Sequence, residues 1–254
     1  MPTVSRLSIA PVRSLGLEHR DAIDVTDRGV VEDRRFYVTD ATNRLVDQLV
    51  EATLVQVKAW TDPEATRLRL TFPDGSVIDD AVELGEHIET PIHGRTAVGH
   101  VLAGPWGPAL SDFLGRDVRI VRCERPGGTR IKGMVSLVSD GSLDALGVML
   151  GVGAVDARRF RMLIELVGGR AHEEDTWAGS RIGLGTAVIE VTAPVARCAM
   201  TTHDPDTGAR DLDTLRAIKD YRGLVQGKDL MFGVEGEVVE PGTIRIGDEV
   251  RLLD

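Results

Sequence analysis

The chain has 254 residues, 42% of them hydrophobic and 28% charged, so it can bury one large core or two smaller ones. Its formal net charge of −10 argues against a general nucleic-acid binder, because such proteins need a cationic surface for the phosphate backbone. No run of 18 apolar residues occurs, and the N-terminus lacks the apolar segment of a secretory signal. We therefore expect no membrane association and a cytoplasmic protein.

The first part of the chain reads as short strands joined by tight turns, in keeping with its many glycines and prolines. Strands are predicted at residues 4–9, 22–25, 36–39, 54–60 and 67–72. Residues 99–108 have the composition of a loop, and we place a domain boundary at their end. This gives a β-rich module over residues 1–108 and a second module over residues 109–254.

The second part mixes strands with short helices. A helix at residues 109–114 ends at Gly115, and Ser139 or Asp140 is the N-cap of a helix over residues 142–150. Further strands are predicted at residues 118–123, 135–138, 161–167 and 186–191, a helix at 212–218, and a β-meander from 234 to 253. Residues 124–133 have turn formers and charge without an apolar period, which predicts a mobile surface loop. The sum is a mainly-β protein with a few short helices.

Cysteine and histidine usage limits the metal chemistry. Cys123 and Cys198 are the only cysteines, and two reduced thiols are a simpler interpretation than one disulfide. The chain cannot supply the four cysteines of an iron–sulfur cluster, so any redox function needs electrons from elsewhere. The six histidines lack the paired spacing of a zinc site.

Cys198 follows Arg197 at the end of a predicted strand, and three interpretations remain open. It could be a buried core thiol, a nucleophile whose thiolate Arg197 favours, or a ligand for a metal that prefers sulfur. His203 lies five residues further on, but nothing in the spacing makes it the base for Cys198.

Arginines are conspicuous in this acidic chain. Seven lie at predicted strand ends or turns: Arg13, Arg34, Arg35, Arg158, Arg159, Arg161 and Arg197. Guanidinium groups match phosphate in a bidentate manner, whereas the alternative is that these are solvated surface charges. A glycine-rich phosphate loop and a serine nucleophile elbow are both missing from the sequence.

Short motifs in a fixed order connect these residues. They are Arg159-Phe160-Arg161, residues 174–179, Arg197-Cys198, residues 201–208, Phe232-Gly233 and residues 242–248. This series resembles the MOSC domain, the C-terminal domain of molybdenum cofactor sulfurases and their relatives. Residues 11–15, and Asp33-Arg34 ahead of Phe36, resemble the β-barrel module that precedes MOSC in that group. The resemblance covers almost the whole chain and implies a MOSC-type β-barrel with a smaller N-terminal β-rich module.

The resemblance also implies a molybdenum cofactor, that is, molybdenum on a molybdopterin, with Cys198 as the metal ligand. Positions that hold the pterin phosphate or frame the metal in relatives fall on Arg13, Ser14, Arg34, Arg161 and Arg197. Thr201 and Asp204 join the cofactor-binding set through the same motifs. Some relatives reduce N-hydroxylated small molecules with electrons from a partner, and others are thought to carry sulfur.

Two departures from the family pattern bear on function. Relatives usually continue Arg-Phe-Arg with Pro-Asn, whereas Met162-Leu163 follow here, so an amide expected near the cofactor is missing. Neither a ferredoxin-like domain nor a desulfurase module is present in this chain, so the electron or sulfur donor is expected to be a separate protein. The favoured function is reduction of N-hydroxylated substrates. The alternatives are a sulfur carrier with a persulfide on Cys198, and a binding module without metal.

Overall fold

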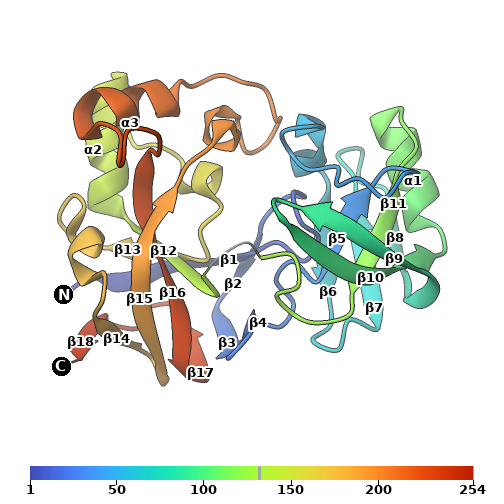
Figure 1. The fold of residues 1–254 in the computed structure, drawn as a ribbon, viewed down its shortest axis with the longest axis horizontal. Helices are drawn as coiled ribbons and strands as arrows, with labels where there is room; N and C mark the ends of the chain where they lie inside the picture. The colour runs from blue at the N-terminus through green and yellow to red at the C-terminus, as the bar shows by residue number, and fades with distance from the viewer. Residues whose placement is uncertain (131–132, 254) are drawn as a thin grey trace.

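The computed structural model describes residues 1–130 and 133–253, which form two halves lying side by side (Figure 1). We call them the large-sheet half, with β1–β4, β12–β18, α2 and α3, and the small-sheet half, with β5–β11 and α1. Strands dominate both halves, and three α-helices accompany them in the described ranges. The predicted mainly-β class with a few short helices is confirmed.

An eight-stranded sheet organises the large-sheet half, in the order β18-β14-β15-β16-β12-β13-β1-β2. Its strands are β1 (Thr3–Ile9), β2 (Glu18–Arg20), β12 (Val135–Ser139), β13 (Ile164–Val167), β14 (Arg181–Leu184), β15 (Ala187–Ala196), β16 (Met231–Glu240) and β18 (Arg251–Leu253). The first strand of the chain thus lies inside a sheet built mostly from the second half of the sequence. β1 pairs antiparallel with β13, with Leu7 opposite Ile164, while β12 and β13 run parallel.

A three-stranded sheet completes this half, in the order β17 (Gly242–Arg245), β3 (Ala22–Thr26) and β4 (Gly29–Val30). In β3, the alternation of buried Ile23 and Val25 with exposed Asp24 turns one face inward. Ile23 lies opposite Ile244 of β17, and both belong to one core with Leu7 and residues of the large sheet. Burial of this apolar surface joins the N-terminal strands to the C-terminal ones.

The small-sheet half contains two sheets around a second core. The first has the order β5 (Phe36–Thr39), β11 (Arg119–Cys123), β10 (Arg95–Ala103) and β9 (Glu83–Ile92), and the second has β6 (Lys58–Thr61), β7 (Arg67–Thr71) and β8 (Val77–Ala81). Helix α1 (Trp106–Leu114) contributes Trp106, which is almost fully buried and donates from its indole Nε1 to the Leu68 carbonyl at 2.9 Å. Gly115 ends α1 in a left-handed conformation, as predicted.

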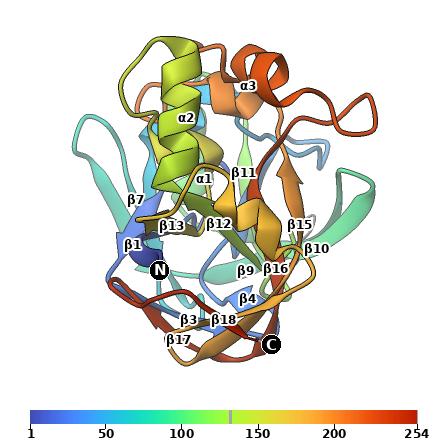
Figure 2. The same cartoon turned by 90° about the vertical axis from the view of Figure 1, so that its left-hand side faces the viewer.

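Helices α2 (Asp140–Leu150) and α3 (Thr214–Arg222) lie together at one end of the large-sheet half (Figure 2). The predicted N-cap Ser139 is confirmed, since its hydroxyl accepts from the Ser142 backbone at 3.2 Å. Short 3-10 helices occur at η1 (Ala52–Gln56), η2 (Ala157–Phe160), η3 (Glu173–Trp177) and η4 (Ala199–Thr202). None of the helices in the described ranges has the length and apolar character needed to cross a membrane.

Several predictions of local structure are wrong. Residues 99–108 are not a loop, because β10 continues to Ala103 and α1 begins at Trp106. Residues 54–56 belong to η1, so the predicted strand starts only at Lys58. The C-terminal meander does not form: β17 pairs with β3 and β18 pairs with β14. Alternation in a sequence identifies a strand and its faces but not its partner.

Strands from the two sides of the predicted boundary at residue 108 pair with each other in both halves of the fold. β1 pairs with β13, and β5 pairs with β11. The limits of the two modules, 1–108 and 109–254, stay a prediction, but the strands on the two sides of residue 108 are interleaved.

Candidate functional site

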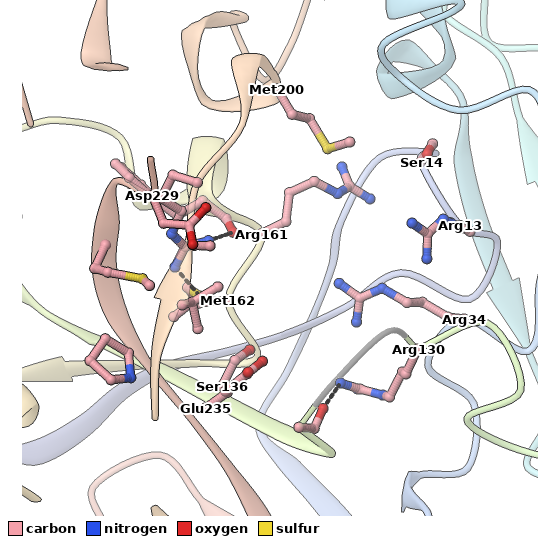
Figure 3. A pocket seen from close by; sticks show the side chains of 17 residues that line it. Arg13, Ser14, Arg34, Arg130, Ser136, Arg161, Met162, Met200, Asp229 and Glu235 are labelled. Carbon is pink, nitrogen blue, oxygen red and sulfur yellow. Dashed lines mark hydrogen bonds between the residues drawn. The ribbon is translucent and has the colours of Figure 1, made fainter. Parts of the chain in front are cut away.

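A cleft of about 360 Å³ opens where the segments that connect the two halves meet the ends of β15 and β16 (Figure 3). Five of the predicted site residues line it: Arg13, Ser14, Arg34, Arg161 and Arg197. They come from four separate parts of the chain, and the fold brings them together.

Local backbone geometry directs three of these side chains. Ser14, Arg34 and Arg161 have φ values of 72°, 52° and 52°, in the left-handed region that non-glycine residues rarely adopt. Arg161 ends η2, and for this reason β13 begins at Ile164 rather than at the predicted residue 161. Backbone strain of this kind persists only where surrounding contacts over-determine it, and it concentrates at functional sites.

Asp33 is the buried carboxylate behind the arginines. One of its oxygens accepts from the Ala10 backbone at 2.8 Å, and the other accepts from Arg34 at 2.6 Å and from Arg130. Burial alone would raise the pKa of Asp33, but the charges of Arg34 and Arg130 hold that pKa below its usual range. Asp33 therefore stays ionised and anchors two guanidinium groups.

Arg13, Arg34, Arg130 and Arg161 form the cationic wall of the cleft, and their side chains lie along one side of it in Figure 3. Arg13 donates to the Thr129 carbonyl at 2.7 Å, and Arg161 donates to the Leu15 carbonyl at 2.6 Å. Burial, together with the neighbouring charge of Arg34, lowers the pKa of Arg161 to about 9. Arg161 therefore remains cationic at neutral pH.

Arg197 differs from these four arginines because all three nitrogens of its guanidinium donate to acceptors of the protein. It donates from Nε to the Phe232 carbonyl at 2.7 Å, from Nη1 to the Phe160 carbonyl at 3.1 Å and from Nη2 to the Met162 thioether at 2.8 Å. The guanidinium also lies over the Phe160 ring, 5.2 Å from its centroid. These contacts fix the backbone that leads into Cys198.

Cys198 is exposed and precedes η4, between two residues that line the cleft, Arg197 and Met200. Cys198 itself, Thr201 and Asp204 are not among the described residues that line it. The Thr201 hydroxyl bonds the Cys198 carbonyl at 3.2 Å and the Thr214 hydroxyl at 2.7 Å, which ties η4 to α3. The Asp204 carboxylate accepts from the Asp206 and Thr207 backbone in a tight turn. Their place in a cofactor site stays a prediction, and the geometry gives both a role in shaping the segment after Cys198.

The opposite wall is apolar and rich in methionine. Met162, Met200 and Met231 line it together with Pro194 and Val195. Methionine is flexible and polarisable, so such a wall adapts to apolar groups of different shape. Asp229 and Glu235 add two carboxylates to the lining, and the charge of Glu235 acts on Arg130 of the cationic wall (Figure 3).

The two residues that depart from the family pattern, Met162 and Leu163, lie in different surroundings. Met162 lines the cleft, whereas Leu163 is buried in the core of the large-sheet half. The Leu163 backbone donates to the Ser136 hydroxyl at 3.1 Å, and Ser136 lines the cleft. A hydroxyl from β12 is therefore the polar group beside the place where an amide was expected.

Sequence reasoning missed Arg130, Ser136 and the methionines. Arg130 belongs to the segment predicted as a mobile surface loop, and that prediction is wrong for Thr129 and Arg130, which are buried. Ile131 and Lys132, in the same segment, lie outside the described residues. No local pattern marks Arg130, because its partner Asp33 is 97 residues away in the sequence. Three or more His, Cys, Asp or Glu side chains do not come together as a metal site anywhere in the described ranges.

The two thiols differ sharply in reactivity. Cys123 is fully buried, and burial raises the pKa of its thiol to about 12, whereas Cys198 is exposed. We expect a water-soluble disulfide reagent to modify one thiol per folded chain and Cys198→Ser to react only after unfolding in urea. Two equivalents of fast reaction in the native protein, followed by absorbance, would contradict this assignment.

Comparison with known proteins identifies the family of this chain. The sequence matches the MOSC domain over residues 120–251 and the MOSC N-terminal beta barrel domain over residues 1–100. It is 27% identical to the mitochondrial amidoxime-reducing component 1 of Mus musculus, over 99% of this chain and 82% of that protein. It is also 27% identical to the molybdenum cofactor sulfurase of Caenorhabditis briggsae, over 100% of this chain and 36% of that protein.

Among solved structures, the YUAD protein of Bacillus subtilis aligns over 98% of this chain and 94% of its own, with a TM-score of 0.46 and 14% identity. The family matches extend through both halves of the fold and take in the cleft residues from Arg13 to Glu235. The chain belongs to the MOSC domain family.

Proposed function

We propose that this chain holds a molybdenum–pterin cofactor in the cleft and reduces N-hydroxylated small molecules with electrons from a separate donor protein. The observation that carries the proposal is the pairing of a cationic wall with an exposed thiol, Cys198, beside the same cleft. Support also comes from relatives named amidoxime-reducing components, which align with nearly the whole chain. The cytoplasmic location stays a prediction.

The residues present fit such a cofactor. Arg13 and Arg130 each have a buried Nε that lacks a hydrogen-bond partner among the described residues, so the wall has donors to spare for a phosphate. The Cys198 thiolate is the kind of ligand that a sulfur-preferring metal selects. Arg197, which is committed to carbonyl groups, would position Cys198 rather than hold the phosphate.

The chemistry divides between cofactor and protein. When bound, the cofactor would supply the two-electron chemistry that converts an N–OH group, two electrons and two protons into N–H and water. The arginines of the cationic wall would neutralise the phosphate and fix its position. The methionine wall would receive the apolar part of the substrate and exclude water, and the Ser136 hydroxyl would offer one hydrogen bond.

The second candidate function is sulfur transfer, and the exposure of Cys198 favours it. Cys198 would accept one sulfur atom from a donor's persulfide, releasing the donor's thiol, and would then pass that sulfur on. The 27% identity to a molybdenum cofactor sulfurase over the whole chain is compatible with this role. A metal-free binding module is the remaining alternative, because Leu163 gives the cleft no amide.

Metal analysis of Cys198→Ser tests the proposal. Protein expressed in a host that makes molybdenum cofactor should contain about one molybdenum per chain by mass spectrometry, and Cys198→Ser should lose nearly all of it. Cys123→Ala is the matched control, since it removes the other, buried thiol. An unchanged molybdenum content in Cys198→Ser would show that the Cys198 thiolate is not the metal ligand. If wild type contains neither molybdenum nor pterin, and Cys198 carries a cyanide-labile sulfur, the sulfur-carrier function is correct instead.

A further inference from the structure

We propose that Arg130, which neither the sequence motifs nor the family resemblance assigns, is an anion-binding residue of the cleft, acting on a phosphate group together with Arg13 and Arg34. The inference rests on the proposed function only for the identity of the anion, which would be the phosphate of the cofactor. That the site takes a phosphate group is inferred from the burial, the donors and the charge of the arginine side chains.

Arg130 combines deep burial with unused donors. It is 6% exposed and lines the cleft, with one hydrogen bond to Asp33 and a longer one, 3.3 Å, to the Gly133 carbonyl. Its Nε is buried and has no partner among the described residues. A guanidinium has five N–H donors, and among the described residues two of those of Arg130 have acceptors. Buried donors are rarely left unsatisfied, and a bound acceptor would account for this one.

The backbone around Arg130 is held by the same segments that supply the other arginines. Arg13 donates to the Thr129 carbonyl at 2.7 Å, and the Thr129 hydroxyl donates to the Arg34 carbonyl at 3.2 Å. Arg95 donates to the Arg130 carbonyl at 3.0 Å. Arg130 is therefore fixed before any ligand arrives, which lowers the entropy lost on binding.

The cationic wall holds four arginines around one buried carboxylate, Asp33, which pairs with Arg34 and Arg130. The carboxylates of Glu235 and Glu237 also act on the charge of Arg130. Burial lowers the pKa of Arg13 and of Arg130 to about 10, and the charge of Arg34 contributes to the lowering in both. A phosphate dianion would relieve this repulsion between guanidinium groups and accept from several of them at once.

A purely structural role for Arg130 would be to neutralise Asp33. Arg34 already pairs with the same carboxylate at 2.6 Å, so Asp33 is neutralised without Arg130. At Asp33 itself, the second arginine therefore adds positive charge rather than cancelling negative charge. In a chain with a net charge of −10, such a local excess calls for an anionic ligand.

Titration with inorganic phosphate tests the inference. Calorimetry at neutral pH and constant ionic strength, with chloride as the background anion, should show phosphate binding that Arg130→Gln weakens about tenfold or more. Arg125→Gln is the matched control, because Arg125 lies on the same segment but is exposed and outside the cleft lining, and it should bind as wild type does. In protein from a cofactor-making host, Arg130→Gln should also retain less molybdenum than Arg125→Gln.

A second measurement on the wild-type protein covers the case in which Arg130→Gln fails to fold. The arginine Nε–H resonance of Arg130, assigned by its absence in Arg130→Lys, should shift as phosphate is added, because this Nε is the unpartnered donor. Equal phosphate affinity in Arg130→Gln and wild type, or a stationary Nε–H signal, would overturn the inference. Phosphate binding that depends on Arg130 in a protein without molybdenum would uphold the inference while the proposed function fails.

Discussion

Replacing Asp33 with Asn should lower the free energy of unfolding by about 3–5 kcal/mol, the usual effect of removing one partner from a buried ion pair. The amide keeps the shape of the carboxylate but leaves Arg34 and Arg130 without their shared buried counter-charge. Urea unfolding followed by circular dichroism measures the change. Asp79→Asn is the matched control, since Asp79 also pairs with two arginines, Arg67 and Arg69, but at the surface, and we expect a much smaller loss.

The same pair gives a pH dependence with a definite sign. Because the pKa of Asp33 is lowered in the folded protein, its contribution to stability is complete above the unfolded pKa near 4 and is lost as pH falls through the folded value. The difference in stability between wild type and Asp33→Asn should therefore shrink as the solution is acidified below about pH 4. A loss no larger than that of Asp79→Asn, or a difference that grows on acidification, would contradict the role assigned to Asp33.

Replacing Arg197 with Met should cost about 2–3 kcal/mol of stability and leave phosphate binding unchanged. The substitution removes four hydrogen bonds and leaves the Phe160 and Phe232 carbonyls, on two buried residues, without these donors. Arg197→Lys should recover part of the loss, because it restores the charge without the planar fork. Urea unfolding and the phosphate titration, run side by side, separate the two roles proposed for this residue.

The matched comparison for Arg197 is Arg161→Met. Among the described residues Arg161 makes one side-chain hydrogen bond, to the Leu15 carbonyl, and it lines the cleft. This variant should therefore weaken phosphate binding about tenfold with a smaller effect on stability. If Arg197→Met is the variant that loses phosphate affinity, Arg197 holds the anion, and the positioning role is wrong.

Local features of the fold could be predicted because local interactions determine them. The alternation in β1 and β3, the Ser139 cap and the Gly115 terminus all follow from neighbouring residues. Strand partners could not be predicted, since β3 joins β17 across more than 200 residues and nothing in either segment names the other. The predicted C-terminal meander was wrong for this reason.

The site divides in the same way. Resemblance to a family chose eight residues, of which five line the cleft: Arg13, Ser14, Arg34, Arg161 and Arg197. Cys198, Thr201 and Asp204, chosen in the same way, are not among the described residues that line it. Arg130 lay outside the family motifs, and its place depends on a contact with Asp33 that only the folded chain creates. Nor does sequence reveal that Arg197 points its guanidinium at carbonyl groups while Arg161 leaves most of its donors free.

The position of β1 between β13 and β2 also constrains the order in which the chain can fold. β1 can pair with β2 as soon as Glu18–Arg20 have been made, but its other edge has no partner until Ile164–Val167 follow, so during synthesis on the ribosome that edge must wait for most of the polypeptide. The small-sheet half, which depends on residues 36–123, can form earlier, before the strands β12–β16 and β18 of the large sheet have been made. Such long-range closure slows folding and leaves strand edges open to wrong partners. In this molecule the cleft, which needs both halves, is among the last features to be assembled.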